Sequence, residues 1–188
     1  MIEVIAFKGR GGFGKSTAAK YVVGKGYVKT SFATPIRAMM AAIGCSEAEL
    51  VGALKERPSA TLSGRSPREA MQLLGTEWGR HLSESFWTNL WRSHAEMILD
   101  QGGHGVVVDD CRFPNEADVV RAMGGYVIEI IGPESVTDVG IPGHASELQD
   151  FDPDITIIND LHDLAAFHAS IDEALAVLTS ELEDDRAA

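Results

Sequence analysis

A glycine-rich segment near the amino terminus has the residue spacing that phosphate binding requires. Residues 9–16 read Gly-Arg-Gly-Gly-Phe-Gly-Lys-Ser and match the pattern G-x-x-x-x-G-K-S. Glycines let successive backbone N–H groups turn toward phosphate oxygens, and the amino terminus of a following helix adds partial positive charge. In such a loop the lysine reaches the β- and γ-phosphates and the serine hydroxyl ligates Mg²⁺. The motif predicts a nucleoside triphosphate site built from Gly11, Gly12, Phe13, Gly14, Lys15, Ser16 and Thr17.

The same segment also fits the dinucleotide-binding pattern G-x-G-x-x-G, through Gly9, Gly11 and Gly14. That turn needs an acidic residue about 20 positions further on, to bind the ribose. The chain has no Asp or Glu between Glu3 and Glu47. The missing acid and the Lys-Ser pair favour the triphosphate site.

Two adjacent carboxylates, Asp109 and Asp110, end an apolar segment that reads as a strand. A carboxylate at such a position commonly holds magnesium or its water in nucleotide-binding proteins. Neighbouring residues of a strand point to opposite faces, so we expect only one of the two to face the metal. A polar strand end that caps the next helix is the structural alternative, and we favour the metal-binding interpretation. Arg112 either lies over a transferring phosphoryl group or pairs structurally with a carboxylate, and the sequence leaves both open.

Four polar residues recur at intervals of four: Arg68, Gln72, Thr76 and Arg80. A continuous helix would align them along one face. A solvated stripe is the usual explanation for such spacing. Two cations around an amide also suit a ligand that carries both a phosphate and a base, and we favour this second interpretation.

Strand and helix patterns alternate along the chain and predict an α/β fold. Short apolar segments indicate strands at 2–7, 27–32, 105–110, 126–131 and 155–158. Helical patterns cover 15–23, 34–43, 46–55, 67–101 with a break near 81–85, 114–123 and 161–182. We expect a parallel sheet with helices on both faces. The polar segments 56–66 and 132–153 read as loops, and their closure over bound substrates is a hypothesis.

Length and charge limit the classes of function. A chain of 188 residues with 45% hydrophobic residues fits one domain. Residues 1–121 carry 15 basic and 13 acidic side chains, net +2, whereas residues 122–188 carry one basic and 15 acidic side chains, net −14. The total of −12 argues against general affinity for nucleic acid, and an anionic ligand must bind mainly to the first two thirds.

No apolar run approaches the roughly 18 residues of a membrane span. Cys45 and Cys111 lack the spacing of a zinc site or a disulfide framework. We therefore expect a cytoplasmic protein that acts on small molecules without membrane or nucleic-acid partners. Whether it forms a homodimer is left open by the sequence.

Taken together, the motifs resemble the phage-type deoxynucleoside monophosphate kinases, which belong to the adenylate-kinase-like P-loop kinases. The segment Asp-x-Arg-Phe-Pro-Asn-Glu, together with His-x-Ser-Glu further on, is its most specific part. The resemblance covers residues 1–160 through the segments 7–19, 31–37, 67–80, 108–117, 124–125, 144–147 and 157–159.

The resemblance implies a P-loop three-layer sandwich in a single domain, residues 1–188. It also implies a helical monophosphate-binding region at about 34–101, a lid-like loop at about 132–153, and ATP with Mg²⁺ as cofactors. Lys15, Arg112 and Asp110 would be catalytic, and Ser16 would share the metal with Asp110, which rather than Asp109 aligns with the family aspartate. The residues implied to face the monophosphate are Arg37, Arg68, Gln72 and Arg80.

One feature departs from the adenylate kinases, which carry arginines in the lid. The segment 132–153 contains no arginine. Charge compensation during transfer would then come from Arg10, Arg112, other upstream cations or a partner subunit.

Two other functions fit a P-loop. A kinase of a small-molecule hydroxyl, of the dephospho-coenzyme A or shikimate type, would favour a carboxylate base near the acceptor. A nucleotide-binding switch or ATPase would have a conformational output and no phosphorylated small product. The preferred base, and the preference for deoxyribose over ribose, are left open.

Overall fold

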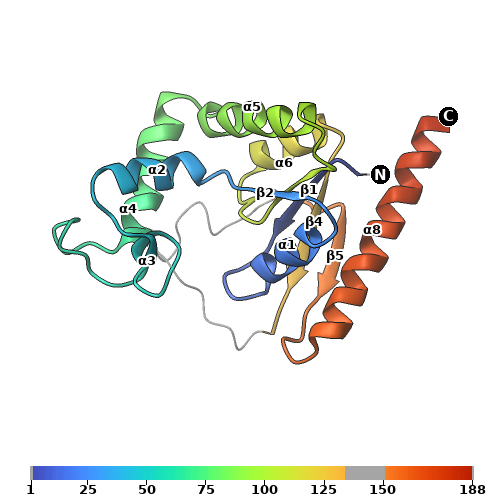
Figure 1. The fold of residues 1–188 in the computed structure, drawn as a ribbon, viewed down its shortest axis with the longest axis horizontal. Helices are drawn as coiled ribbons and strands as arrows, with labels where there is room; N and C mark the ends of the chain where they lie inside the picture. Colours follow the sequence, from blue (N-terminus) through green and yellow to red (C-terminus); the bar gives the residue numbers. More distant parts are fainter. Residues whose placement is uncertain (1, 134–150, 188) are drawn as a thin grey trace.

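The computed structural model describes residues 2–133 and 151–187, and its centre is a five-stranded parallel sheet. The strand order is β2-β3-β1-β4-β5, and each neighbouring pair is parallel. Figure 1 shows helices on both sides of this sheet. The predicted α/β class and parallel sheet are therefore confirmed, with strands at Val4–Lys8 (β1), Val28–Thr30 (β2), Val106–Val108 (β3), Tyr126–Ile131 (β4) and Ile155–Ile158 (β5).

Alternate residues of β1, β3 and β4 enter two separate cores. Ile5 and Phe7 of β1 pack with α1 (Lys15–Val23) and α8 (Leu164–Ala187). Val4 and Ala6 pack on the other face with α5 (Phe86–Asp100) and α6 (Pro114–Ala122). Full burial of such a side chain contributes about 1.5–3 kcal/mol for the larger residues. The two cores produce the three layers of the fold.

A helical region with a third core adjoins the sheet. It contains α2 (Thr34–Ala42), α3 (Glu47–Leu50), α4 (Pro67–Leu73) and the π-helix η1 (Leu74–Arg80). Figure 1 shows α2, α3 and α4 at the opposite end of the molecule from α8. The buried side chains of this third core are Ile36, Met40, Cys45, Leu50, Met71 and, from α5, Trp87.

The helix that carries the four-residue spacing runs from Pro67 to Arg80 and changes its hydrogen bonding midway. Ser66 caps it, because its Oγ accepts from Glu69 N at 3.2 Å. From Leu74 the helix is a π-helix, a rare form that is frequent at functional sites. Gly79 lies against Trp87 so closely that an added Cβ would be 2.3 Å from the ring, which explains a glycine there.

Two helix boundaries differ from the expected ones. The Ser46 capping box does start α3, but the helix ends at Leu50 instead of near residue 55, and the chain continues in turns, with Lys55 N donating to Gly52 O. Helix α8 begins at Leu164 instead of 161, since Leu161 adopts a left-handed φ of 67°. The lid-like loop expected at 132–153 lies outside the described residues from 134 to 150, as do His144 and Glu147. No helix in the described ranges is both long and apolar enough to cross a bilayer.

The glycine-rich loop joins β1 to α1 and is held from two sides. Gly9 has φ 130°, and a Cβ there would lie 2.3 Å from the backbone oxygen of Ile130. After β5, Asn159 is buried and its Nδ2 donates to Phe13 O at 2.9 Å. The sheet therefore fixes the shape of this loop before any ligand binds.

Replacing Asn159 by Ala should lower the free energy of unfolding by about 1–3 kcal/mol, because it leaves the Phe13 carbonyl without its partner. Urea denaturation measures this loss. Asn89→Ala is the matched control, since the Asn89 amide makes only an exposed bond to Ser85 among the described contacts. Equal stability of the two variants would contradict the anchoring role.

Candidate active site

The glycine-rich loop has the geometry of an anion site. Lys15 is buried, and its Nζ donates to Gly9 O at 2.6 Å and to Arg10 O at 2.7 Å. Gly14, with φ 98°, precedes α1, whose first turn contains no acidic residue. No acidic residue of the helix's own first turn therefore offsets the partial positive charge of this helix end. The arrangement suits phosphate oxygens.

The serine of this loop is next to Asp109. Ser16 Oγ donates to Asp109 Oδ2 at 2.6 Å, and Lys29 Nζ from β2 lies 2.6 Å from the same oxygen. Val107 of β3 packs with α1, so strand alternation also directs Asp109 to the α1 side. A hydroxyl and a carboxylate are ligands that Mg²⁺ accepts, and this carboxylate already attracts a cation. The donor set fits a magnesium ion held by Ser16 and Asp109.

Asp110, which we expected to share the metal with Ser16, lies elsewhere. Its carboxylate accepts from Ser31 Oγ at 2.5 Å, from Phe32 N at 3.0 Å and from Ala33 N at 3.1 Å. Like Val108, it points to the α5–α6 side of the sheet. It fixes the turn between β2 and α2. In this structure Ser16 bonds to Asp109 and not to Asp110, and the metal role expected for Asp110 stays a prediction.

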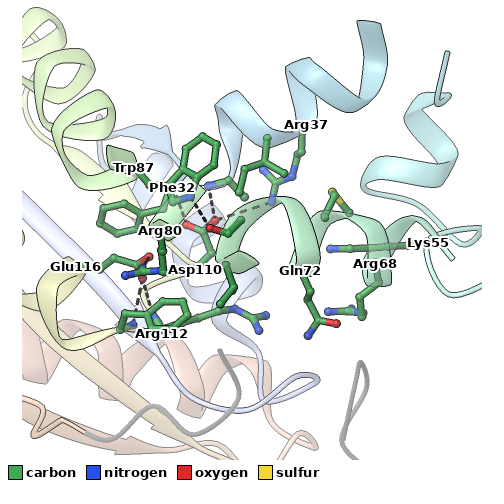
Figure 2. A pocket seen from close by; sticks show the side chains of 16 residues that line it. Phe32, Arg37, Lys55, Arg68, Gln72, Arg80, Trp87, Asp110, Arg112 and Glu116 are labelled. Carbon is green, nitrogen blue, oxygen red and sulfur yellow. Dashed lines mark hydrogen bonds and ion pairs between the residues drawn. The ribbon is translucent and has the colours of Figure 1, made fainter. Parts of the chain in front are cut away.

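A pocket lies on that other side, between the helical region and the end of β3 (Figure 2). The structure brings all the predicted acceptor residues to it, together with Asp110 and Arg112. Five basic and two acidic side chains line the pocket, a formal excess of three positive charges. Apolar side chains form further parts of its wall. The charged lining residues are Arg37, Lys55, Arg68, Arg80, Arg112, Asp110 and Glu116, and the larger apolar ones are Phe32, Ile36, Met71, Trp87 and Phe113.

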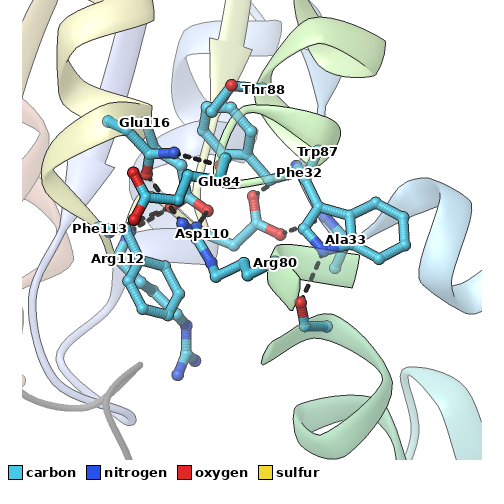
Figure 3. Close-up of polar contacts among 12 residues, drawn as sticks. Phe32, Ala33, Arg80, Glu84, Trp87, Thr88, Asp110, Arg112, Phe113 and Glu116 are labelled. Carbon is cyan, nitrogen blue, oxygen red and sulfur yellow. Dashed lines mark hydrogen bonds and ion pairs between the residues drawn. The ribbon is translucent and has the colours of Figure 1, made fainter. Parts of the chain in front are cut away.

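Within this pocket, Arg80 is bound to the protein itself. Its Nη2 lies 2.8 Å from Glu116 Oε1, its Nη1 donates to Asn115 Oδ1 at 2.9 Å, and its guanidinium stacks over Phe113 (Figure 3). Burial raises the pKa of Glu116 to about 7, although Arg112 N and Phe113 N also donate to its other oxygen. Arg80 therefore shapes the wall of the pocket.

Arg37 and Arg68 are held more loosely. Arg37 Nη1 donates to Ser31 Oγ at 3.0 Å, and its Nη2 lies 4.0 Å from Asp110 Oδ2. In the described part of the chain, its buried Nε has no hydrogen-bond partner. Arg68 pairs through Nε with Glu56, at the edge of the pocket. Both retain donors for a ligand.

Lys55 completes the lining, and sequence reasoning missed it. It was expected at the end of a helix, next to a polar loop, where no motif distinguishes it. Burial and the positive charges of Arg68, Arg37 and Arg112 lower its pKa to about 8. Only the folded chain reveals this, because Lys55 reaches the pocket through the turn that ends α3 early.

The described residues contain no group of three or more His, Cys, Asp or Glu side chains suited to a metal. A metal held by Ser16, Asp109 and ligand phosphates needs no such cluster. The site can thus bind a polyphosphate at the loop and a second anion in the pocket. Asp109 and Asp110 join the two halves.

Comparisons with known proteins found similar sequences and similar structures. The family model for deoxynucleotide monophosphate kinase matches residues 54–170. A relative from Acanthamoeba polyphaga mimivirus, named "Putative deoxynucleotide monophosphate kinase", is 30% identical over 169 residues, which are 83% of this chain and 88% of the relative.

Two solved structures are also similar. Shikimate kinase from Bacteroides thetaiotaomicron has a TM-score of 0.47 and 13% identity, over 95% of this chain and 99% of its own. Dephospho-CoA kinase from Campylobacter jejuni has a TM-score of 0.44 and 14% identity, over 94% and 97%.

The buried carboxyl of Glu116 should make stability depend on pH. Its pKa is raised from 4.5 to about 7 on folding, so its favourable contribution is complete below pH 4.5 and is lost as the pH rises through 7. We expect the stability of the protein relative to Glu116→Gln to fall by up to about 3 kcal/mol across this window. Denaturation at several pH values measures it. The exposed Glu96, paired with Arg92, supplies the control variant Glu96→Gln, and a flat difference for Glu116→Gln would contradict the raised pKa.

Proposed function

The chain belongs to the deoxynucleotide monophosphate kinase family, and on this premise we propose that it transfers the γ-phosphoryl group of ATP to a deoxynucleoside monophosphate, giving the diphosphate and ADP. The chain is a phosphotransferase, and the proposal concerns its substrates. One observation supports it most. The consecutive residues Asp109 and Asp110 face the loop and the cationic pocket respectively, so a donor and an acceptor bound there would meet at the end of β3.

On the donor side, the loop would hold the triphosphate. Its backbone N–H groups and Lys15 would bind the β- and γ-phosphates, for which Lys15 must exchange its bonds to Gly9 O and Arg10 O. Ser16 and Asp109 would hold Mg²⁺, with Lys29 displaced from the carboxylate. When bound, the metal neutralises charge on the phosphates.

On the acceptor side, the pocket offers cations and no available general base. A monophosphate has a second pKa near 6 and is mostly ionised at neutral pH, so it needs no proton acceptor. The two lining carboxylates are occupied: Asp110 accepts bonds from the β2–α2 turn, and Glu116 binds Arg80 and two backbone N–H groups. This favours a phosphate acceptor over a hydroxyl acceptor, for which a carboxylate base would be expected.

Arg112 follows the two aspartates directly and lines the pocket. At that position a cation would offset the charge that accumulates between donor and acceptor, the role the lid arginines have in adenylate kinases. Catalysis would then consist of positioning and charge neutralisation. A nucleotide switch would have no use for a second cationic pocket beside the loop.

Lys15→Ala should lower kcat by roughly 10²–10³-fold, because one preorganised cation at the transferring group is lost. ADP release with ATP and Mg²⁺ measures this against a panel of ribo- and deoxyribonucleoside monophosphates. Lys20→Ala, on an exposed face of α1, is the control. Full activity of Lys15→Ala would refute the donor site.

The same panel separates the alternatives. A kinase of hydroxyl acceptors would ignore monophosphates and phosphorylate an alcohol. An ATPase switch would release phosphate and form no phosphorylated small product.

The two aspartates should behave differently. Asp109→Asn should raise the Mg²⁺ concentration for half-maximal activity, because the carboxylate beside Ser16 is lost. Asp110→Asn should raise the KM for the monophosphate at nearly unchanged Mg²⁺ requirement, because Arg37 and the β2–α2 turn lose their anchor. Magnesium titrations of both variants test this, and the reverse pattern would restore Asp110 as the metal-facing residue.

A further inference from the structure

We propose that Lys55, together with Arg37 and Arg68, binds the phosphate of the acceptor nucleotide, and that acceptor binding brings a proton onto Lys55. The inference rests on the proposed function and adds a residue that neither the motifs nor the family resemblance supplies. It also assigns Arg80, which we expected at the phosphate, to the wall of the pocket.

A backbone hydrogen bond to Arg68 holds Lys55 at the edge of the pocket. Its carbonyl accepts from Arg68 N at 2.9 Å, which ties the turn after α3 to the start of α4. Figure 2 shows the side chains of Lys55 and Arg68 extending alongside each other from the same end of the pocket. The Lys55 side chain is half-buried and is one of the lining residues.

The cations of the pocket differ in their partners. Arg68 has Glu56, Arg80 has Glu116, and Arg37 approaches Asp110. For Lys55, no carboxylate of the described residues lies within ion-pair distance. A lysine that served only the fold would be expected to pair with a carboxylate or to remain in water.

The groups that face Lys55 come from every neighbouring element. Arg68 from α4, Arg37 from α2 and Arg112 from the segment after β3 repel its charge, and Glu56 of its own turn attracts it. Together with burial, this repulsion lowers the pKa of Lys55 to about 8. An anion among these cations would reverse the balance and favour the ammonium form.

The orphaned Arg37 Nε supports the same subsite independently. It is a buried donor without a partner in the described chain, and Arg37 lines the same pocket as Lys55. Buried donors are normally satisfied, so an acceptor atom that a ligand brings to Arg37 would complete its hydrogen bonding. Phosphate oxygens would satisfy Arg37 and Lys55 together.

Arg80 has the opposite character. Its guanidinium already binds Glu116 and Asn115 and stacks on Phe113. Recruiting it to a phosphate would leave Glu116 buried without its cation, which is costly. Lys55 has no such commitment, and it is therefore the better phosphate ligand.

The decisive experiment is calorimetry of deoxynucleoside monophosphate binding at pH 8 in two buffers of different ionisation enthalpy, with the monophosphate that the wild type uses best. The wild type should take up about half a proton, as expected for a group with a pKa of about 8. Arginines do not titrate there, and the acceptor phosphate is already ionised. Lys55→Arg should bind with similar affinity and without proton uptake.

Lys55→Gln should raise the KM for the monophosphate about 10–100-fold, because a charge-assisted hydrogen bond is lost, and should leave the KM for ATP unchanged. It should also raise the Tm of the ligand-free protein at pH 7, since an uncompensated cation is removed. Arg57→Gln, an exposed cation two residues further on, is the matched control for both measurements.

Each outcome decides the proposal. It is overturned if Lys55→Gln binds the monophosphate as tightly as the wild type, or if Lys55→Arg retains the proton uptake. Wild-type protein that binds ATP but no nucleoside monophosphate would instead refute the proposed function. Weak binding by Arg57→Gln would show a general loss of positive charge and would count against a specific subsite.

Discussion

Consecutive side chains of a β-strand point to opposite faces of the sheet. The two aspartates that follow β3 keep this alternation, so their carboxylates lie on opposite sides. Asp109 lies beside Ser16 on the α1 side, and Asp110 anchors the β2–α2 turn on the α5–α6 side. The glycine-rich loop and the cationic pocket therefore contact neighbouring residues that directly follow one buried strand. Their spacing depends on the covalent geometry of a single peptide unit, which leaves little freedom for the two halves to separate.

Charge compensation shapes the pocket as strongly as its apolar wall. Burying a cation is expensive unless an anion or a hydrogen-bond acceptor accompanies it. Arg80 and Glu116 satisfy this requirement within the protein, and they stabilise the segment that carries Arg112. The cationic excess that remains is a cost of folding that a bound anion would offset. The Arg80–Glu116 pair therefore stabilises the protein, whereas other cations of the pocket remain available to a ligand.

In the helical region, the sequence predicts the helix from Pro67 to Arg80, and packing changes the hydrogen bonding of its second half. The four-residue spacing from Arg68 to Arg80 indicates a polar helix face, and the structure places all four residues on the pocket. It does not indicate the π-helix, which accommodates the approach of Trp87 to Gly79 and the bond from Trp87 Nε1 to Gly75 O at 2.7 Å. That approach depends on α5, which comes later in the chain.

Local patterns determined the parallel sheet, the phosphate-binding loop and the acceptor helix, because hydrophobic periodicity, glycine spacing and helix caps act over a few residues. They also indicated that only one of Asp109 and Asp110 could face a metal, but the resemblance favoured Asp110. Tertiary structure determines which of the two lies beside Ser16, since that depends on which sheet face α1 covers, and it favours Asp109. It likewise decided the partner of Arg80 and the position of Lys55. Side chains distant in sequence form ion pairs and hydrogen bonds only after the elements pack. The spacing of residues along the chain does not predict those contacts.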